Sequence, residues 1–266
     1  MKGMNWIDVN GAGLRYDISG DGPKTLVLVH EMGGTLESWD QVLPMLQTGR
    51  RILRYDWRGA GMSEKARTRL DFDLMTDDLA ALLDTLGIVQ KVAITGCAVG
   101  AGIAMRFTCR FPTRVGALIA MAPATGVPLD RREATLARIM RMEREGPRAV
   151  AEEGFASSYP PEVRHDSEGF RKFRARWLGN DPNSYGMIHR MLLDADIESG
   201  FSRIACPTLV LAGKHDRSRP PEAVEPIARM IPAAQFRTVD SGHFMAVQTP
   251  NLIAETIGGF LTSIGY

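Results

Sequence analysis

The 266-residue sequence predicts an α/β fold, in which a twisted, mostly parallel sheet of about eight strands carries helices on both faces. The first observation is that short apolar runs alternate with amphipathic stretches along most of the chain. The second is the stretch GCAVG at residues 96–100, whose glycines have the spacing of a sharp strand-to-helix turn. The third is a block without strand-like runs at residues 126–200, which predicts a helical cap over the carboxyl edge of the sheet.

The expected strands are short runs rich in aliphatic and β-branched residues. Residues 25–29, with the sequence TLVLV, form a nearly continuous apolar run, as a strand buried on both faces does. The first two strands flank Asn10-Gly11-Ala12 and predict a hairpin. The expected strands are 5–9, 13–18, 25–29, 51–55, 91–95, 116–121, 208–212 and 235–239.

The expected helices show apolar residues at helical spacing and end at glycine or proline. Gly87 closes the helix expected at 74–86, and Pro112 ends the helix expected at 99–111. The remaining expected helices are 221–230 and 252–261 in the core, and 131–145, 148–157, 168–178 and 184–193 in the cap. We therefore divide the chain into a core, 1–125 and 201–266, and an inserted cap, 126–200.

Composition restricts the class of function. The formal net charge of +1 gives no indication of binding to nucleic acid or to an anionic membrane. No apolar run is long enough to span a membrane, and no signal peptide is expected at the N-terminus. Three cysteines without zinc-ligand spacing predict reduced thiols in a cytoplasmic protein. Because the sequence has no metal-ligand cluster, phosphate loop or dinucleotide motif, we expect no metal and no cofactor. We expect a small-molecule substrate, and a protein that is a monomer or a homodimer.

The GCAVG stretch has the frame of a nucleophile elbow, but its central residue, Ala98, carries no nucleophilic group. An elbow strains the backbone of its central residue and needs small residues two positions away on each side. With Cys97 as the apex, the β-branched Thr95 and Val99 would occupy those positions. We therefore interpret Cys97 as a packed thiol beside the site rather than as the nucleophile.

Two further residues lie where a catalytic acid–base pair is expected. His243 follows the last expected strand and Asp216 follows strand 208–212, so both belong to the carboxyl edge of the sheet. A carboxylate there can orient the histidine ring and stabilise its protonated form. Alternatively, His243 is a surface loop residue and Asp216 serves the start of the next helix. The chain order of elbow, acid and histidine favours the catalytic interpretation.

The stretch HEMGG at residues 30–34 follows strand 25–29 and is the expected partner of the elbow. The N–H groups of Met32 and Val99 are the expected donors of an oxyanion hole. Glu31 is either a second carboxylate near the site or, as we favour, a solvated loop residue. A basic cluster at 171–176 either meets a substrate carboxylate or, as we favour, forms a solvated helix face. Further possible substrate-site residues are His30, Gly33, Cys97, Trp39 and Trp177.

These stretches resemble the α/β-hydrolase superfamily over nearly the whole chain, and most of all the 3-oxoadipate enol-lactonase group. The resemblance rests on residues 30–34, TLESWD at 35–40, YDWRGAGMS at 55–63, the elbow, residues 213–221 and SGH at 241–243. It implies an α/β-hydrolase fold, cofactor-free hydrolysis of a small ester, lactone or related bond, and a triad that includes Asp216 and His243. It also implies a structural role for Ser63. Ala98 departs from the family pattern at the nucleophile, and Glu31 stands where glycine is usual.

Three interpretations of Ala98 are open. In the first, which we favour, alanine replaces the serine of a triad hydrolase, so that binding persists while turnover falls by orders of magnitude. In the second, alanine is native and His243 acts directly as a general base in a lyase, decarboxylase or hydratase, with Glu31 as a candidate second carboxylate. In the third, the protein is catalytically inactive and binds a small ligand under its cap.

Overall fold

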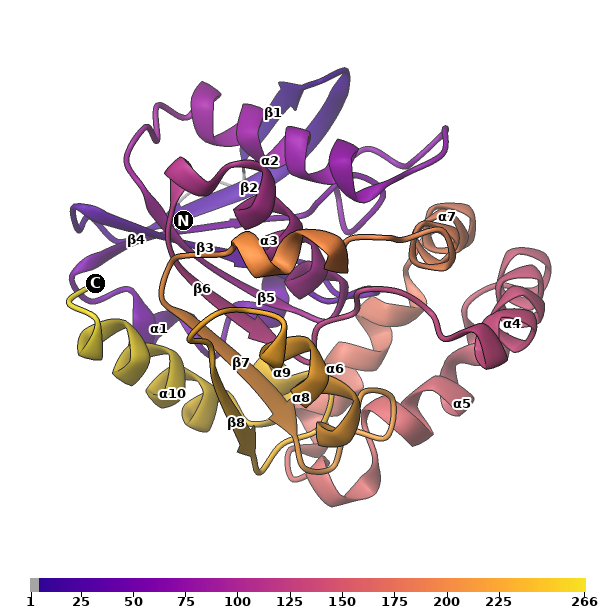
Figure 1. Ribbon diagram of the computed structural model, residues 1–266. Coiled ribbons are helices and arrows are strands. Elements are labelled where there is room, and N and C mark those ends of the chain that lie inside the picture. Colours follow the sequence, from indigo (N-terminus) through magenta and orange to yellow (C-terminus); the bar gives the residue numbers. More distant parts are fainter. Residues whose placement is uncertain (1–4) are drawn as a thin grey trace.

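The computed structural model describes residues 5–266 and contains an eight-stranded sheet (Figure 1). The strands lie in the order β1-β2-β4-β3-β5-β6-β7-β8. Their bounds are β1 Asn5–Val9, β2 Ala12–Ser19, β3 Lys24–Val29, β4 Arg50–Tyr55, β5 Val92–Cys97, β6 Val115–Met121, β7 Thr208–Gly213 and β8 Gln235–Val239. Pairing is antiparallel between β1 and β2 and between β2 and β4, and parallel between the other neighbours. The predicted α/β class with a mostly parallel sheet is confirmed. The signal-peptide expectation rests largely on residues 1–4, which lie outside the described residues.

The hairpin of β1 and β2 has a shorter turn than we predicted. Its two turn residues, Asn10 and Gly11, both have positive φ, at 49° and 73°. Such a turn matches the right-handed twist of the strands that it joins. Ala12 pairs with Val9 and belongs to β2, so the expected three-residue turn is wrong by one residue.

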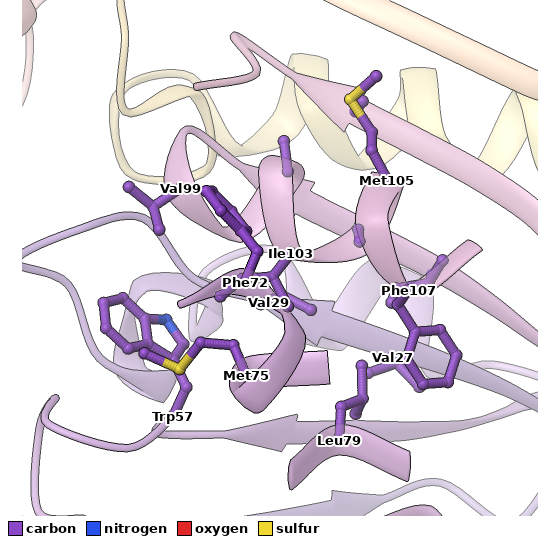
Figure 2. Close-up of a cluster of buried hydrophobic side chains, with 14 of the residues drawn as sticks. Val27, Val29, Trp57, Phe72, Met75, Leu79, Val99, Ile103, Met105 and Phe107 are labelled. Atoms are coloured by element: carbon purple, nitrogen blue, oxygen red, sulfur yellow. The ribbon is translucent and has the colours of Figure 1, made fainter. Parts of the chain in front are cut away.

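Helices cover both faces of the sheet, because successive side chains of each strand point to opposite faces. Val27 and Val29 of β3 pack with α2 and α3 (Figure 2), whereas Leu26 and Leu28 pack on the other face against α10. The first face is covered by α2 Phe72–Thr85, α3 Val99–Arg110 and α8 Pro221–Arg229, and the second by α1 Leu43–Leu46, α9 Met245–Gln248 and α10 Pro250–Ser263.

The start of α2 lies two residues before the expected position. The side chain of Asp71 accepts a hydrogen bond from the Leu74 N–H at 2.8 Å, which satisfies one of the free donors of the first turn. Helix α10 likewise starts earlier than expected, at Pro250, because proline is well suited to the first position of a helix.

Four helices between β6 and β7 gather on one side of the sheet (Figure 1). They are α4 Arg132–Glu145, α5 Arg148–Ser158, α6 Ser167–Leu178 and α7 Pro182–Leu193. Their aromatic side chains form a cluster of their own, which reaches the core at Phe244, where Phe173 lies 4.8 Å away between ring centroids. The domain boundaries at 126 and 200 stay an interpretation. None of the described helices is long and apolar enough to cross a membrane.

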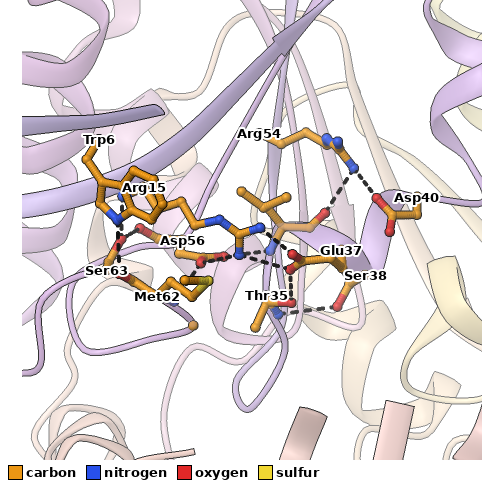
Figure 3. Close-up of polar contacts among 12 residues, drawn as sticks. Trp6, Arg15, Thr35, Glu37, Ser38, Asp40, Arg54, Asp56, Met62 and Ser63 are labelled. Carbon is orange, nitrogen blue, oxygen red and sulfur yellow. Dashed lines mark hydrogen bonds and ion pairs between the residues drawn. The ribbon is translucent and has the colours of Figure 1, made fainter. Parts of the chain in front are cut away.

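A buried charged network lies beyond the end of β4 (Figure 3). Asp56 is fully buried and accepts hydrogen bonds from the N–H groups of Leu36 at 2.7 Å and Met62 at 2.8 Å. Its Oδ2 also lies 3.1 Å from Nη1 of Arg15, which in turn pairs with Glu37. A buried carboxylate with this many donors holds two loops of the core in place.

Ser63 belongs to this network. Its hydroxyl accepts a hydrogen bond from the Arg15 N–H at 2.8 Å and donates one to the Asp56 carbonyl oxygen. These two contacts give Ser63 the structural position that the family resemblance implies.

The network predicts acid sensitivity of the fold. Burial favours a higher pKa for Glu37, but hydrogen bonds from Arg15 and Thr35 lower the pKa from 4.5 to about 2. A carboxylate with a depressed pKa stabilises the fold above its unfolded-state pKa, and this stabilisation is lost as the pH falls through the folded-state pKa. We therefore expect the unfolding free energy to fall by on the order of 3 kcal/mol as the pH drops from about 5 to about 2 and Glu37 is protonated.

Urea unfolding across this pH window would measure the effect in the parent chain and in Glu37→Gln. The variant should lose this part of the pH dependence. Glu222→Gln is the matched control, because Glu222 is exposed and forms no ion pair in residues 5–266. Identical pH dependence in Glu37→Gln and in the parent chain would contradict the assignment.

Candidate active site

A cavity of about 590 Å³ lies between the core and the cap. Ala98 and His243 line it from the core, and Phe155 and Trp177 line it from α5 and α6. Its position at the carboxyl edge of the parallel strands is where open α/β sheets bind ligands.

The elbow occupies the junction of β5 and α3. Ala98 has φ 52° and ψ −115°, a conformation that is costly for any residue with a side chain and that concentrates at functional sites. The flanking glycines are needed, since a Cβ on Gly96 would lie 2.2 Å from the Gly100 carbonyl oxygen. A Cβ on Gly100 would lie 2.3 Å from the His30 carbonyl oxygen. Ala98 therefore stands at the centre of a tight strand-to-helix turn framed by two glycines, and its place as the nucleophile position stays a prediction.

His243 and Asp216 come together beside this elbow. Nδ1 of His243 lies 2.6 Å from Oδ2 of Asp216, whose other oxygen accepts hydrogen bonds from the N–H groups of Ser218 and Arg219 at 2.8 Å and 2.9 Å. Burial favours a higher pKa for Asp216, but His243 and these N–H groups outweigh it and lower the pKa. These contacts favour the ionised form of the Asp216 carboxylate and hold the His243 ring in one orientation.

Cys97 supports the loop that carries His243. Its Sγ donates a hydrogen bond to the His243 carbonyl oxygen at 3.2 Å. Burial, and after it the charge of Glu31, raise the pKa of the Cys97 thiol well above its ordinary range. A buried, protonated thiol is a poor nucleophile. The structure therefore places Cys97 behind the site, as a packed thiol.

The loop after β3 supplies the second side of the site. Met32 lines the cavity, and it lies in a turn closed by a hydrogen bond from the Gly34 N–H to the Glu31 carbonyl oxygen at 3.0 Å. The N–H groups of Met32 and Val99 donate to no backbone carbonyl within residues 5–266. That of Val99 is free of an intrahelical partner because it belongs to the first turn of α3. The role of these two N–H groups as oxyanion donors stays a prediction.

Glu31 lies behind this loop. Its side chain is only 1% exposed and accepts a hydrogen bond from the Ser38 hydroxyl at 2.7 Å. The expectation of a solvated glutamate is therefore wrong, and Glu31 is absent from the cavity lining. Close packing explains the difference, because a Cβ on Gly34 would lie 2.2 Å from Oε1 of Glu31. Sequence alone gave no signal for this burial.

Trp39 and His30 do not reach the cavity. Trp39 is fully buried among the side chains between the sheet and α10, so the expected substrate contact is replaced by core packing. His30 stacks on Trp57 with ring centroids 4.9 Å apart, and its Nδ1 lies 2.7 Å from the Glu31 carbonyl oxygen. His30 therefore supports the loop rather than contacting a ligand.

The cap contacts the loop directly at Gly33. A Cβ on Gly33 would lie 2.4 Å from Nε1 of Trp177, and Nδ2 of Asn180 donates to the Gly33 carbonyl oxygen at 2.9 Å. A second contact joins the cap to the base, since the His243 N–H donates to the Ser158 carbonyl oxygen at 3.2 Å. The cap therefore positions both the expected oxyanion donor and the histidine.

Sequence reasoning missed several ionisable residues of the cavity wall. They are Arg131, Arg138, His189, Arg217 and Arg219. Two of these residues could have been found from the sequence, because Arg131 and Arg138, with Thr135 between them, lie at the spacing of one helix face. The basic cluster at 171–176 lies outside the cavity lining, and its side chains form exposed ion pairs such as Lys172 with Glu168 at 2.7 Å. The favoured solvated face agrees with these contacts.

A family model described as alpha/beta hydrolase fold matches residues 24–250. The chain belongs to the α/β-hydrolase fold family. One relative of this chain is the pyrrolizixenacetamide deacetylase of Xenorhabdus hominickii, which is 25% identical over 98% of both chains. Another is 3-oxoadipate enol-lactonase 2 of Acinetobacter baylyi, 24% identical over 85% of this chain and 84% of the relative.

Solved structures support the same assignment. A thermophilic esterase from Thermogutta terrifontis, solved with malate bound, has a TM-score of 0.89 and 26% identity, covering 99% of this chain and 98% of the esterase. The enol-lactonase from Burkholderia xenovorans has a TM-score of 0.91 at 24% identity, covering 97% of this chain and 100% of the lactonase. The predicted α/β-hydrolase fold and the similarity to enol-lactonases are confirmed.

The geometry of the elbow predicts a contrast between two glycines. We expect Gly100→Ala to lower the unfolding free energy by roughly 1–3 kcal/mol, because the new methyl group meets backbone atoms that cannot move aside easily. Gly259→Ala is the control, since Gly259 lies in α10 with no atom within 4 Å of its added Cβ. The control should gain about 0.5–1 kcal/mol from helix propensity. Equal stability changes in the two variants, measured by urea unfolding, would contradict the close approach at the elbow.

Proposed function

We propose that this α/β hydrolase has a site for cofactor-free hydrolysis of a small ester, lactone or related bond, with Ala98 at the position of the nucleophile. The observation that carries the proposal is the 2.6 Å contact between His243 and Asp216, beside a cavity that Ala98 also lines. The N–H groups of Met32 and Val99 support it as donors to a carbonyl oxygen.

A serine at position 98 would complete an acyl-transfer mechanism. Its hydroxyl oxygen attacks the substrate carbonyl carbon while His243 takes the proton, and the two N–H groups stabilise the negative oxygen. His243 then gives the proton to the leaving group, and an acyl-enzyme forms. Water deprotonated by His243 attacks this ester, which releases the acid and restores the serine hydroxyl. Asp216 stabilises the imidazolium in both steps.

Alanine at position 98 removes only the attacking oxygen from this scheme. The cavity, the donors and the acid–base pair do not depend on that oxygen, so substrate binding is retained while turnover falls by orders of magnitude. This is the behaviour expected of a serine-to-alanine replacement in a triad hydrolase.

A second function is supported by the intact His243–Asp216 pair, which needs no nucleophile to act as a base. His243 would then take a proton from water or from the substrate, as in a hydratase, decarboxylase or lyase, and contribute roughly 10²–10⁴-fold to the rate. Glu31 does not serve as a second carboxylate in this scheme, because it is buried against Ser38 away from the cavity lining.

The substitution Ala98→Ser tests the hydrolase proposal. We expect kcat/KM on p-nitrophenyl acetate to rise at least roughly 10³-fold, because a triad nucleophile contributes up to roughly 10⁶-fold in a serine hydrolase. The double variant Ala98→Ser with His243→Ala should return to the level of the parent chain. A folded Ala98→Ser protein without esterase or lactonase activity would overturn the proposal.

The role of Asp216 is tested in the same background. Adding Asp216→Asn to Ala98→Ser should lower kcat by roughly 10³–10⁴-fold with little change in KM, because an amide favours the wrong tautomer of His243. Steady-state kinetics on one ester measure both parameters. An unchanged kcat would remove Asp216 from the mechanism.

The second function makes a separate prediction for the parent chain. A lyase, decarboxylase or hydratase with His243 as base should turn over its substrate with Ala98 in place and lose that activity in His243→Ala. Product analysis of candidate ligands incubated with the parent chain measures this. A ligand recovered unchanged from the cavity points instead to binding without catalysis.

A further inference from the structure

A histidine of the cap lines the cavity without a hydrogen-bond partner. His189 lies in α7, and its half-buried side chain belongs to the cavity lining. Its Nδ1 atom is buried and forms no hydrogen bond within residues 5–266. Its Nε2 atom has no partner in this part of the chain either, but it is not fully buried. Folded proteins pair most of their buried polar atoms, so an unpaired ring in a cavity wall calls for a physical reason.

The ring of His189 is uncharged at neutral pH. Burial, and after it the positive charges of Arg138 and Arg190, lower the pKa of His189 from 6.5 to about 3. Both arginines form ion pairs with glutamates of the cap. A neutral imidazole has one N–H donor and one nitrogen acceptor, so His189 offers a ligand hydrogen bonds rather than charge.

The two ring nitrogens of His189 differ in their surroundings, and this difference favours one tautomer. A proton on Nδ1 would leave a buried N–H without an acceptor, and unpaired buried N–H groups are rarer in folded proteins than unpaired acceptors. A proton on Nε2 instead places the donor on the nitrogen that is not fully buried. We therefore expect the Nε2–H group to be the one that meets a ligand.

A row of aromatic contacts holds the His189 ring in place. The ring lies edge-on to that of Tyr185, one helical turn earlier, with ring centroids 5.0 Å apart. Tyr185 lies edge-on to Trp177 of α6 at 5.4 Å, and Trp177 packs on Gly33 in the loop that carries Met32. All three rings line the cavity. His189 is therefore two ring contacts away from the loop of the expected oxyanion donor.

We propose that His189 is a specificity-determining residue, whose Nε2–H group donates a hydrogen bond to an uncharged oxygen of the substrate, such as a ketone or ether oxygen. This inference rests on the proposed function, because the reacting carbonyl group must lie near Ala98 and Met32 while the second oxygen lies at the cap. The substrate is then a small ester or lactone with a further, uncharged acceptor at a distance from the reacting bond.

The hydrogen bond would give this site selectivity rather than general affinity. A substrate without the second oxygen leaves the His189 donor unpaired in the complex, and sites built to pair a polar group reject analogues that lack it. A ligand with the oxygen pairs the donor without moving the ring, because the contacts with Tyr185 already fix its orientation.

Binding to the parent chain tests this contact without acyl transfer, because Ala98 cannot form an acyl-enzyme. The probes are ethyl 5-oxohexanoate, which carries a ketone oxygen, and ethyl hexanoate, in which a methylene replaces the ketone carbonyl. Isothermal titration calorimetry of the full chain measures both dissociation constants. We expect His189→Phe to weaken binding of the oxo ester roughly 3- to 10-fold, as the loss of one neutral hydrogen bond does, and binding of ethyl hexanoate by less than about 2-fold.

Further variants identify the ring nitrogen responsible. His189→Gln places an amide near the position of Nε2 and should keep most of the affinity for the oxo ester. His189→Asn reaches only as far as Nδ1 and should lose affinity as His189→Phe does. This pair decides the matter if His189→Phe fails to fold. His165→Phe is the matched control, because His165 is exposed and lies outside the cavity lining.

Equal losses for both probes in His189→Phe would reveal a role in packing alone and overturn the proposal. An unchanged affinity for the oxo ester, or equal losses in His189→Gln and His189→Asn, would do the same.

The outcomes also separate this inference from the proposed function. Binding of the oxo ester that depends on His189, together with an inactive Ala98→Ser protein, would keep the contact and remove the hydrolase. An active Ala98→Ser protein whose parent binds both probes independently of His189 would keep the hydrolase and remove the contact.

Discussion

The site depends on the close approach of two backbone segments at the junction of β5, α3 and the end of β3. Gly100 brings the first turn of α3 against the carbonyl oxygens of Val29 and His30, and Gly96 lets the turn fold back on itself. Between these glycines Ala98 adopts a positive φ of 52°, and Val99, the first residue of α3, lines the cavity. It also sets the distance between the elbow and the loop that carries Met32. A larger residue at either glycine would displace the elbow, the start of α3 and the loop that carries Met32 from one another.

The cap contacts the core on two sides of the cavity. Trp177 packs against Gly33, and the end of α5 accepts the hydrogen bond from the His243 backbone. The expected oxyanion donor and the base are thus both held by helices that lie far from the elbow in sequence. A change of cap position would alter the size of the cavity and the alignment of the acid–base pair at the same time.

The cavity lining joins the predicted acid–base pair to an arginine. His243 and Arg219 both line the cavity. Asp216 links the two, because it orients His243 through one oxygen and accepts the Arg219 N–H with the other. The absence of a nucleophilic atom at Ala98 leaves this arrangement intact.

The α/β class, the glycine frame of the elbow and the chain order of Ala98, Asp216 and His243 could all be predicted from the amino-acid sequence. These follow from local periodicity and from residue types whose backbone demands are local. Which side chains face the cavity depends instead on how distant segments pack together. Glu31 and Trp39 are buried in packing contacts between distant segments, and the arginines that line the cavity come from segments on either side of β7. Burial and pairing of charges depend on neighbours that lie far apart in sequence, and no local pattern records them.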